Sequence, residues 1–175
     1  MTDVTVTVAD TAATRALGEA LAGVLRAGDL VLLSGPLGAG KTTLTQGIGA
    51  GLGVRGQVAS PTFIIARVHP ALGGGPDLVH VDAYRLGSFE EVDALDLDAS
   101  LEDSVTVVEW GEGKVEALAA DRLEVEVRRP RGGGGTGAAE PEDLAGASPR
   151  EVHVTAVGPR WAGADLAGVL ARWHR

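Results

Sequence analysis

Hydrophobic and polar residues alternate in three separate stretches of the chain. Valine occupies every second position over residues 4–8, with threonines between. Residues 123–128 and 151–157 repeat the pattern, with Leu, Val or Ala at one position and a polar side chain at the next, up to Ala156. A period of two is typical of a strand that buries one side and exposes the other. We therefore predict three half-exposed strands, the last two joined by a long loop over residues 131–149.

Other runs are apolar at nearly every position. Residues 30–33 are of the kind found in strands buried on both sides. The runs at 78–81 and 104–108 are each followed by an acidic residue. A further strand is predicted after the turn Ser60-Pro61-Thr62. Since only residues 69–77 separate it from the strand that begins at residue 78, with no helix between, we expect these two strands to pair antiparallel.

Helical patterns lie between the strands. A helix capped by Asp10 or Thr11 is predicted to run to about Ala27, because its apolar residues recur on one stripe. The tryptophans near the C-terminus, Trp161 and Trp173, are interpreted as packing anchors. Further helices are predicted over residues 42–52, from Ser88 to about Leu95, over 115–120 and from Pro159 to Trp173.

The segment between the strand at 30–33 and the helix at 42–52 carries a phosphate-binding pattern. It has the letters G-P-L-G-A-G-K-T-T and matches G-x-x-x-x-G-K-[ST]. A strand, a glycine loop and a helix N-terminus surround a polyphosphate with backbone N–H groups and the positive end of a helix dipole. A plain glycine turn would give no reason for Lys41 and Thr42 at their positions. The predicted nucleotide-binding residues of the loop are Gly35, Leu37, Gly38, Ala39, Gly40, Lys41, Thr42 and Thr43.

Phosphate chemistry at this loop needs a metal ligand and a group that acts on water. Lys41 would reach the β and γ phosphates, and the Thr42 hydroxyl would bind Mg²⁺. Asp82 and Glu109 each end an apolar strand, where nucleotide hydrolases place an acidic metal ligand. One of these acids is needed for the metal, and the other is free to orient the attacking water. Thr62 fits either a switch loop at the γ-phosphate or a simple turn, and its spacing alone favours the turn.

The composition of the chain limits which binding partners and which kinds of site are expected. The formal net charge is −9 and the chain has no cysteine, which excludes disulfides and thiolate sites. We expect no strong direct binding to nucleic acid, since no basic stripe is present and the arginines at 128–131 are interpreted as a solubilising loop edge. His80 and His153 have no second ligand at a metal-binding spacing, so both are interpreted as structural histidines.

The N-terminus carries no sign of a targeting segment. It has neither the basic nor the apolar part of a secretory signal, and no apolar run has the length of a membrane span. We therefore expect a single cytoplasmic domain over residues 1–175, with no membrane part. The glycine-rich segment 131–149 is predicted to be a flexible insertion in it.

Four motifs in combination resemble the TsaE family of small bacterial P-loop ATPases. They are the phosphate loop, Ser60-Pro61-Thr62-Phe63, the stretch H-V-D-A-Y-R-L from His80 to Leu86, and Val107-Val108-Glu109-Trp110. The resemblance implies a three-layer α/β fold of the P-loop NTPase type, with a mixed, partly antiparallel central sheet flanked by helices. It also implies slow, Mg²⁺-dependent ATP hydrolysis in support of tRNA threonylcarbamoyladenosine formation. The implied partner is a complex of two related proteins that performs the carbamoyl transfer.

The resemblance also implies roles for single residues. Thr42 and Glu109 would hold Mg²⁺, and Asp82 would orient the attacking water. Thr62 would belong to a switch loop and act in catalysis with Lys41, against the turn interpretation. The other residues that the resemblance implies near the nucleotide are Thr11 and Arg150, the last of which follows an insertion longer than the loop of the family. Trp110 is also expected at the nucleotide, because it adjoins the proposed metal ligand Glu109.

Two other functional classes remain open from the sequence. A small-molecule kinase would share the phosphate loop but needs an arginine-rich lid, and no such segment follows the loop helix. A non-hydrolysing adaptor would use ATP binding alone to set its affinity for partners. The sequence does not distinguish this adaptor from an ATPase.

Overall fold

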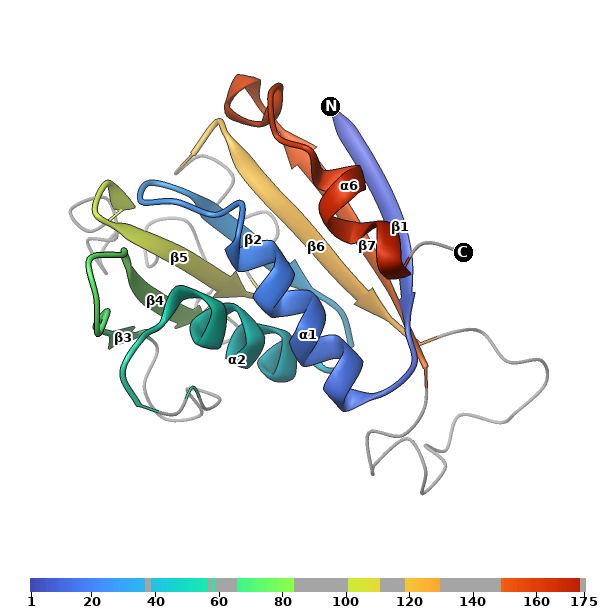
Figure 1. Cartoon of the computed structure of the whole chain (residues 1–175), viewed down its shortest axis with the longest axis horizontal. Helices are drawn as coiled ribbons and strands as arrows, with labels where there is room; N and C mark the ends of the chain where they lie inside the picture. Colours follow the sequence, from blue (N-terminus) through green and yellow to red (C-terminus); the bar gives the residue numbers. More distant parts are fainter. Residues whose placement is uncertain are drawn as a thin grey trace.

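A mixed β-sheet of seven strands forms the centre of the computed structural model (Figure 1). The strands lie in the order β1-β7-β6-β2-β5-β4-β3. The predicted α/β class and mixed sheet are confirmed. The helix predicted from Ser88 lies outside the described residues. Of the helix predicted over 115–120, only Ala119 and Ala120 are described, and they are not helical. The structure describes residues 1–36, 39–56, 58, 66–83, 101–110, 119–129 and 149–173.

Three strands make up the antiparallel half of the sheet: β1 (Thr2–Val8), β7 (Arg150–Val157) and β6 (Arg122–Arg128). Buried and more exposed residues alternate along each of them, as the period of two predicts. β6 and β7 are antiparallel neighbours, so the chain between them makes a hairpin connection, whose residues 130–148 are outside the described part. On the exposed face, the ring nitrogens of His153 contact Thr5 Oγ1 at 2.6 Å and Asp3 Oδ1 at 2.8 Å, which confirms a structural histidine.

The parallel half of the sheet consists of β2 (Leu30–Ser34), β5 (Ser104–Glu109) and β4 (Asp77–Asp82). Every residue of β5 is buried, and three of its six residues are valines. The edge strand β3 (Ala66–His69) pairs antiparallel with β4, and this pairing confirms the prediction drawn from the short connection. Because β2, β5 and β4 run in one direction, their carboxyl ends meet at one edge of the sheet.

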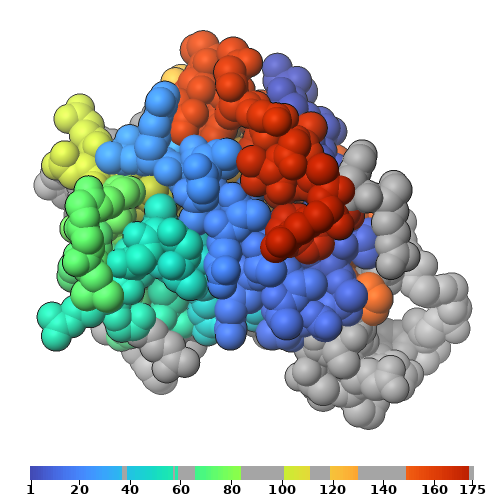
Figure 2. All heavy atoms as spheres, viewed as in Figure 1, coloured from blue at the N-terminus to red at the C-terminus, as the bar shows by residue number. Residues whose placement is uncertain are grey.

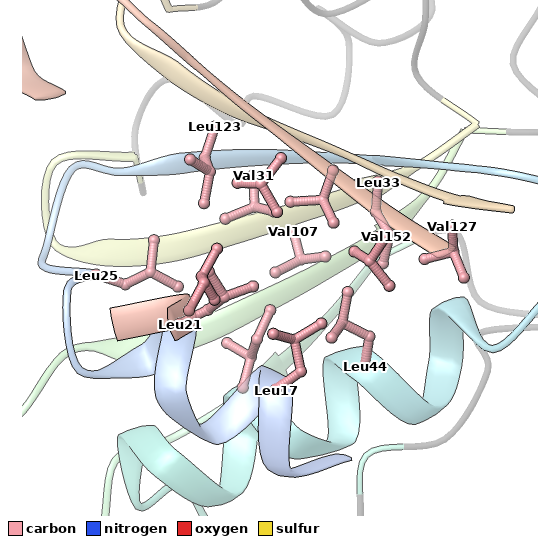
Figure 3. Packing of buried hydrophobic residues seen from close by; sticks show 14 of the residues in the cluster. Leu17, Leu21, Leu25, Val31, Leu33, Leu44, Val107, Leu123, Val127 and Val152 are labelled. Carbon is pink, nitrogen blue, oxygen red and sulfur yellow. The ribbon is translucent and has the colours of Figure 1, made fainter. Parts of the chain in front are cut away.

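Three helices lie on one face of this sheet: α1 (Thr11–Ala22), α2 (Lys41–Leu52) and the short α6 (Leu166–Leu170) (Figure 1). α1 lies between α2 and the C-terminal segment, and side chains fill the space between them (Figure 2). Leucines of the helices and valines of the strands form the main core below (Figure 3). A smaller core occupies the opposite face of the parallel half and consists of Leu30, Leu32, Val79, Val81, Ala83, Leu101 and Val108.

Glycines allow α1 and α2 to pack with their backbones in contact. A Cβ atom on Gly47 of α2 would overlap the carbonyl oxygen of Arg15, and one on Gly18 of α1 would overlap that of Leu44. No side chain larger than hydrogen fits at either position without separating the helices. The close contact fixes α2, whose first turn follows the phosphate loop.

Two predicted helices are shorter than expected. α1 ends at Ala22 and not near Ala27, because Gly23 closes the helix by donating its N–H to Ala20 and Leu21. The predicted continuous helix from Pro159 to Trp173 is wrong. It is divided into a 3₁₀ turn (Pro159–Trp161), α6 and a second 3₁₀ turn (Ala171–Trp173), since Asp165 caps α6 by accepting the Gly168 N–H and so starts a new helix.

The C-terminal tryptophans do pack as predicted. Trp161 is 2% exposed and belongs to the main core, and Trp173 packs against it. Beside Trp161, Arg160 donates two hydrogen bonds to Asp29, at 3.0 and 2.8 Å, and one to the carbonyl oxygen of Val24. The C-terminal segment is thereby tied to the turn that precedes β2.

Candidate nucleotide-binding and catalytic site

The phosphate loop leaves the carboxyl end of β2 and leads directly into α2. Gly35 and Gly40 have φ angles of 139° and 107°, a region that favours glycine. A Cβ atom on Gly35 would also overlap the carbonyl oxygen of Val127 in β6. Gly40 is the N-cap residue of α2. Because glycine has no side chain, no capping side chain accepts hydrogen bonds from the N–H groups of the first turn. Such an uncapped helix N-terminus after a glycine loop suits an anion. Leu37 and Gly38 lie outside the described residues.

Lys41 is held inside the loop from which it would reach the phosphates. It is 6% exposed, and its Nζ donates to the carbonyl oxygens of Gly35, at 2.7 Å, and Pro36, at 3.0 Å. The ammonium also lies 4.3 Å from the centroid of the Trp110 ring. A phosphate oxygen would be a stronger partner for this ammonium than a neutral carbonyl oxygen.

Trp110 owes its position to an unusual backbone conformation. Its φ is 61°, and it is the only residue other than glycine with a positive φ in the described part of the chain. A bulky residue in this region is strained, and such strain is concentrated at functional sites. The conformation directs the chain out of β5 immediately after Glu109 and places the indole over Lys41. Trp110 is therefore at the phosphate loop, and its contact with nucleotide stays a prediction.

Arg150 contacts the loop from the other half of the sheet. It is the first residue of β7 and is 5% exposed. Its Nε donates to the carbonyl oxygen of Ala39 at 3.1 Å, and its Nη1 to that of Pro149. The residue that follows the long insertion thus lies against the phosphate loop, where the resemblance implies it.

The two candidate acids lie side by side at the carboxyl edge. Asp82 and Glu109 are register partners in the parallel pair β4–β5, and Glu109 is also paired with Leu33 of β2, two residues before Gly35. Glu109 is 4% exposed, whereas Asp82 is half-buried. The fold thus brings both acids to the end of the strand that leads into the phosphate loop.

These residues fit a magnesium ion that is held mainly by its nucleotide. In the described ranges no group of three or more His, Asp or Glu side chains could hold a metal by itself. Mg²⁺ retains water and typically takes one or two protein oxygens together with substrate phosphates. The Thr42 hydroxyl in the first turn of α2 and the Glu109 carboxylate are oxygen donors of this kind.

The first turn of α1 lies beside the loop as well. Asp10 is its N-cap and accepts the Ala13 N–H at 2.8 Å, so Asp10, and not Thr11, is the cap. The methyl group of Thr14 would lie 3.8 Å from a Cβ atom on Gly40. Thr11 is the first residue of α1, one turn from this contact. Thr62 lies outside the described residues, so its switch role stays a prediction.

One contact at the site was missed by sequence reasoning. His80 Nε2 lies 2.8 Å from Glu109 Oε2, and both side chains are buried. The sequence shows no acid at a metal-binding spacing from His80, and because only spacing along the chain was considered, this contact was not anticipated. The signal that could have found it is the parallel pairing of the two acid-terminated strands, which places residue 80 two positions before the partner of Glu109.

Comparison with known proteins identifies the family. The family model described as threonylcarbamoyl adenosine biosynthesis protein TsaE matches residues 8–133, which include the phosphate loop, Asp82 and Glu109. This chain belongs to the TsaE family.

TsaE proteins from two bacteria align with most of this chain. The tRNA threonylcarbamoyladenosine biosynthesis protein TsaE of Streptomyces coelicolor is 62% identical over 158 residues, which cover 90% of this chain and 99% of that protein. The protein of the same name from Bacillus subtilis is 36% identical over 149 residues, or 85% of this chain and 82% of that one. The crystal structure of Bacillus subtilis YdiB superposes with a TM-score of 0.67 at 28% identity, over 98% of this chain and 95% of that one. A P-loop NTPase-like fold is thereby confirmed for this TsaE-family chain.

Among the described residues, no helix combines the length and the apolar character needed to cross a membrane.

Proposed function

We propose that this protein binds ATP with Mg²⁺ and hydrolyses it in support of threonylcarbamoyl transfer to tRNA adenosine. One observation carries the proposal. A glycine loop with its lysine, an uncapped helix N-terminus and two strand-end acids meet at one edge of the sheet. Each of these groups has a defined task in phosphoryl transfer.

Binding rests on the loop and the first turn of α2. Backbone N–H groups would hold the phosphates, and Lys41 would exchange its bonds to Gly35 and Pro36 for phosphate oxygens. Arg150, through its bond to Ala39, would keep the loop in shape. Thr42 and Glu109 would hold Mg²⁺, which neutralises charge on the phosphate oxygens when it is bound.

Asp82 is assigned to the attacking water. Its neighbour Glu109 is buried and contacts His80, whereas Asp82 is the more exposed of the two acids and can reach solvent. A carboxylate that accepts a hydrogen bond from water aligns the nucleophile with the γ-phosphate. This difference in exposure supports the division of roles that the resemblance implies.

The proposal includes dependence on a partner. The loop lysine and Mg²⁺ are the cationic groups placed on the phosphates, and in P-loop NTPases a further cation supplied by a partner contributes roughly 10³–10⁵ in rate. We therefore expect the isolated protein to hydrolyse ATP slowly, and faster when it is bound to the carbamoyl-transferase complex of two related proteins. Both are expected in the cytoplasm. The net charge of −9 favours a basic docking surface on that complex, so association should weaken as salt rises.

Phosphate release is the test. Inorganic phosphate and phosphorylated products are measured with Mg²⁺-ATP for the isolated protein and with the partner complex, at low and high salt. Slow release that rises with the complex, more so at low salt, is the expected result, and Lys41→Ala should abolish it in both conditions. Transfer to an acceptor would indicate a kinase, and binding without release an adaptor. Full-speed release in isolation, with no response to the complex, would contradict partner dependence.

A further inference from the structure

We propose that His80 is a positioning residue for the metal-binding carboxylate. Its Nε2 donates a hydrogen bond to Glu109 Oε2 and so holds the carboxylate with Oε1 available for the divalent cation. This inference rests on the proposed function, in which Glu109 binds Mg²⁺. It assigns a task to a buried polar residue that has no place in the phosphate loop or in the acid pair.

The contact is built into the register of the parallel half. His80 pairs with Val107 and Asp82 pairs with Glu109, so His80 and Glu109 point to the same face from adjacent strands. The two side chains meet diagonally, with Nε2 and Oε2 at 2.8 Å. His80 has no exposed surface and Glu109 is 4% exposed, so water does not compete for this bond.

The surroundings of the imidazole decide which of the two nitrogens carries the proton. His80 Nδ1 is buried and has no hydrogen-bond partner in the part of the chain that the structure describes. A proton on Nδ1 would leave a buried donor unsatisfied, whereas a lone pair there is tolerated more readily. A proton on Nε2 and a lone pair on Nδ1 therefore fit the surroundings of both nitrogens. In this form His80 is a donor to Glu109 and nothing else.

Glu109 has no other side-chain hydrogen bond to a described residue. The side chain of Glu109 has three rotatable torsions, and without His80 no hydrogen bond from a described side chain would fix the orientation of the carboxylate. Metal-ligating carboxylates are generally held by a further hydrogen bond, and loss of such a partner typically costs about 10–100-fold in metal affinity or activity. His80 is the residue in place to supply that bond.

Two substitutions of similar size separate positioning from packing. In His80→Gln the amide nitrogen lies where Nε2 lies in histidine, so the donor is retained. In His80→Met a side chain of the same length carries no donor. The measurement is the Mg²⁺ concentration that half-saturates binding of a non-hydrolysable ATP analogue, with metal-free binding of the same analogue and thermal unfolding recorded for each variant.

We expect His80→Met to need about 10–100-fold more Mg²⁺, with metal-free binding unchanged, and His80→Gln to remain close to wild type. A double-mutant cycle with Glu109→Gln adds a second readout and also removes the buried charge that His80→Met would leave unpaired. In the Glu109→Gln background, His80→Met should not change the Mg²⁺ requirement further.

The outcomes distinguish this inference from the proposed function. A wild-type Mg²⁺ requirement in His80→Met, or an equal increase in His80→Gln and His80→Met, would overturn the positioning role alone. Additive effects in the double variant would also overturn it, because His80 would then act independently of Glu109. Wild-type nucleotide binding that does not respond to Mg²⁺ at all would contradict the proposed function itself.

Discussion

The two halves of the sheet differ in where they place charged groups. In the antiparallel half, most charged side chains are half-buried or exposed along the strands and several pair with one another, whereas Arg150 at the start of β7 is buried. Arg122 contacts Glu124 at 2.7 Å, and Arg128 contacts Glu126 at 2.6 Å. In the parallel half, buried apolar residues fill the strands, and the acids are confined to the strand ends, with Asp82 and Glu109 together at the carboxyl edge.

Strand direction explains this difference. Neighbouring strands of the antiparallel half run in opposite directions, so their carboxyl ends alternate between the two edges of the sheet and collect no common group of side chains. β2, β5 and β4 all end at the same edge, and the loop after β2 adds the lysine and the helix N-terminus there. Most charged residues of the antiparallel half therefore face solvent, whereas the acids at the carboxyl ends of the parallel half lie together near the phosphate loop, which Arg150 contacts from β7.

The largest effect is expected when a carboxylate charge is removed in each half of the sheet and turnover is compared. Asp82→Asn should lower kcat by about 10²–10⁴ with Mg²⁺-ATP binding retained, because a group that acts on water matters mainly in the transition state. Glu109→Gln should weaken Mg²⁺-ATP binding and turnover together, since a metal ligand acts in both states. Steady-state kinetics and the nucleotide Kd distinguish the two patterns.

Glu126→Gln is the matched control in the antiparallel half. It removes one negative charge from an exposed pair and should leave kcat and Kd at wild-type values. A comparable loss of turnover in Glu126→Gln would show that the carboxylates of the two halves do not differ in their effect on hydrolysis. The reverse pattern in Asp82→Asn and Glu109→Gln would exchange their roles.

Most of the fold could be predicted because period and connection length are local properties. The alternation over residues 4–8, 123–128 and 151–157 reports one-sided burial directly, and β1, β6 and β7 lie where it predicts. Helix ends were less predictable. Asp165 and Gly23 end or restart helices through contacts that compete with an apolar stripe continuing past them.

The site could be predicted only as far as its groups follow from motifs. Gly35, Gly40 and Lys41 are fixed by one contiguous pattern, and their geometry suits it. The contact between His80 and Glu109 depends on the register of two strands separated by 21 residues, between Asp82 and Ser104, and no local pattern encodes a register. The positive φ of Trp110 was not predictable either, because tryptophan has no preference for that conformation.

A second test compares a buried and an exposed ion pair. Asp29 and Arg160 are largely buried at the start of the parallel half. Arg160→Met removes the charged partner of the Asp29 carboxylate and its two hydrogen bonds, and leaves, among the described residues, only the bond from the Arg26 N–H. We expect a loss of about 3–5 kcal/mol in the free energy of unfolding. Arg128→Met breaks an exposed pair and should leave the free energy of unfolding close to the wild-type value. Urea titrations of both variants measure the difference.

The double variant Asp29→Asn, Arg160→Met controls for the origin of that loss. It removes the uncompensated charge and should recover part of the stability. Equal stability of Arg160→Met and Arg128→Met would show that burial does not distinguish the two pairs.

A third test uses pH, through a buried histidine at the edge of the parallel half. Burial lowers the pKa of His69 from its ordinary value of 6.5, and His80 and Arg67 lower it further, against a hydrogen bond to the Arg55 backbone. Unfolded His69 therefore binds a proton more readily than folded His69. Its contribution to stability is complete above about pH 6.5 and is lost as the pH falls below that value.

His69→Leu should flatten this part of the stability profile. The free energy of unfolding of the wild type and of His69→Leu should differ by a constant amount at alkaline pH, and the two curves should converge or cross as the pH falls from about 6.5 to 5. Parallel curves over the whole range would show that His69 does not contribute to the acid sensitivity.

The smallest effect is expected for the connection between β6 and β7. Its sequence from Gly132 to Ala147 is rich in glycine and lacks the pattern of a strand or an amphipathic helix. Deletion of these residues leaves a short hairpin loop, and the cost of loop closure changes by only about 0.6 kcal/mol per doubling of length. Stability and nucleotide Kd should therefore stay close to wild type, because Arg150 and its bond to Ala39 belong to β7 and not to the insertion. A loss of several kcal/mol, or weaker nucleotide binding at unchanged stability, would show that the antiparallel half contributes more to the site than Arg150.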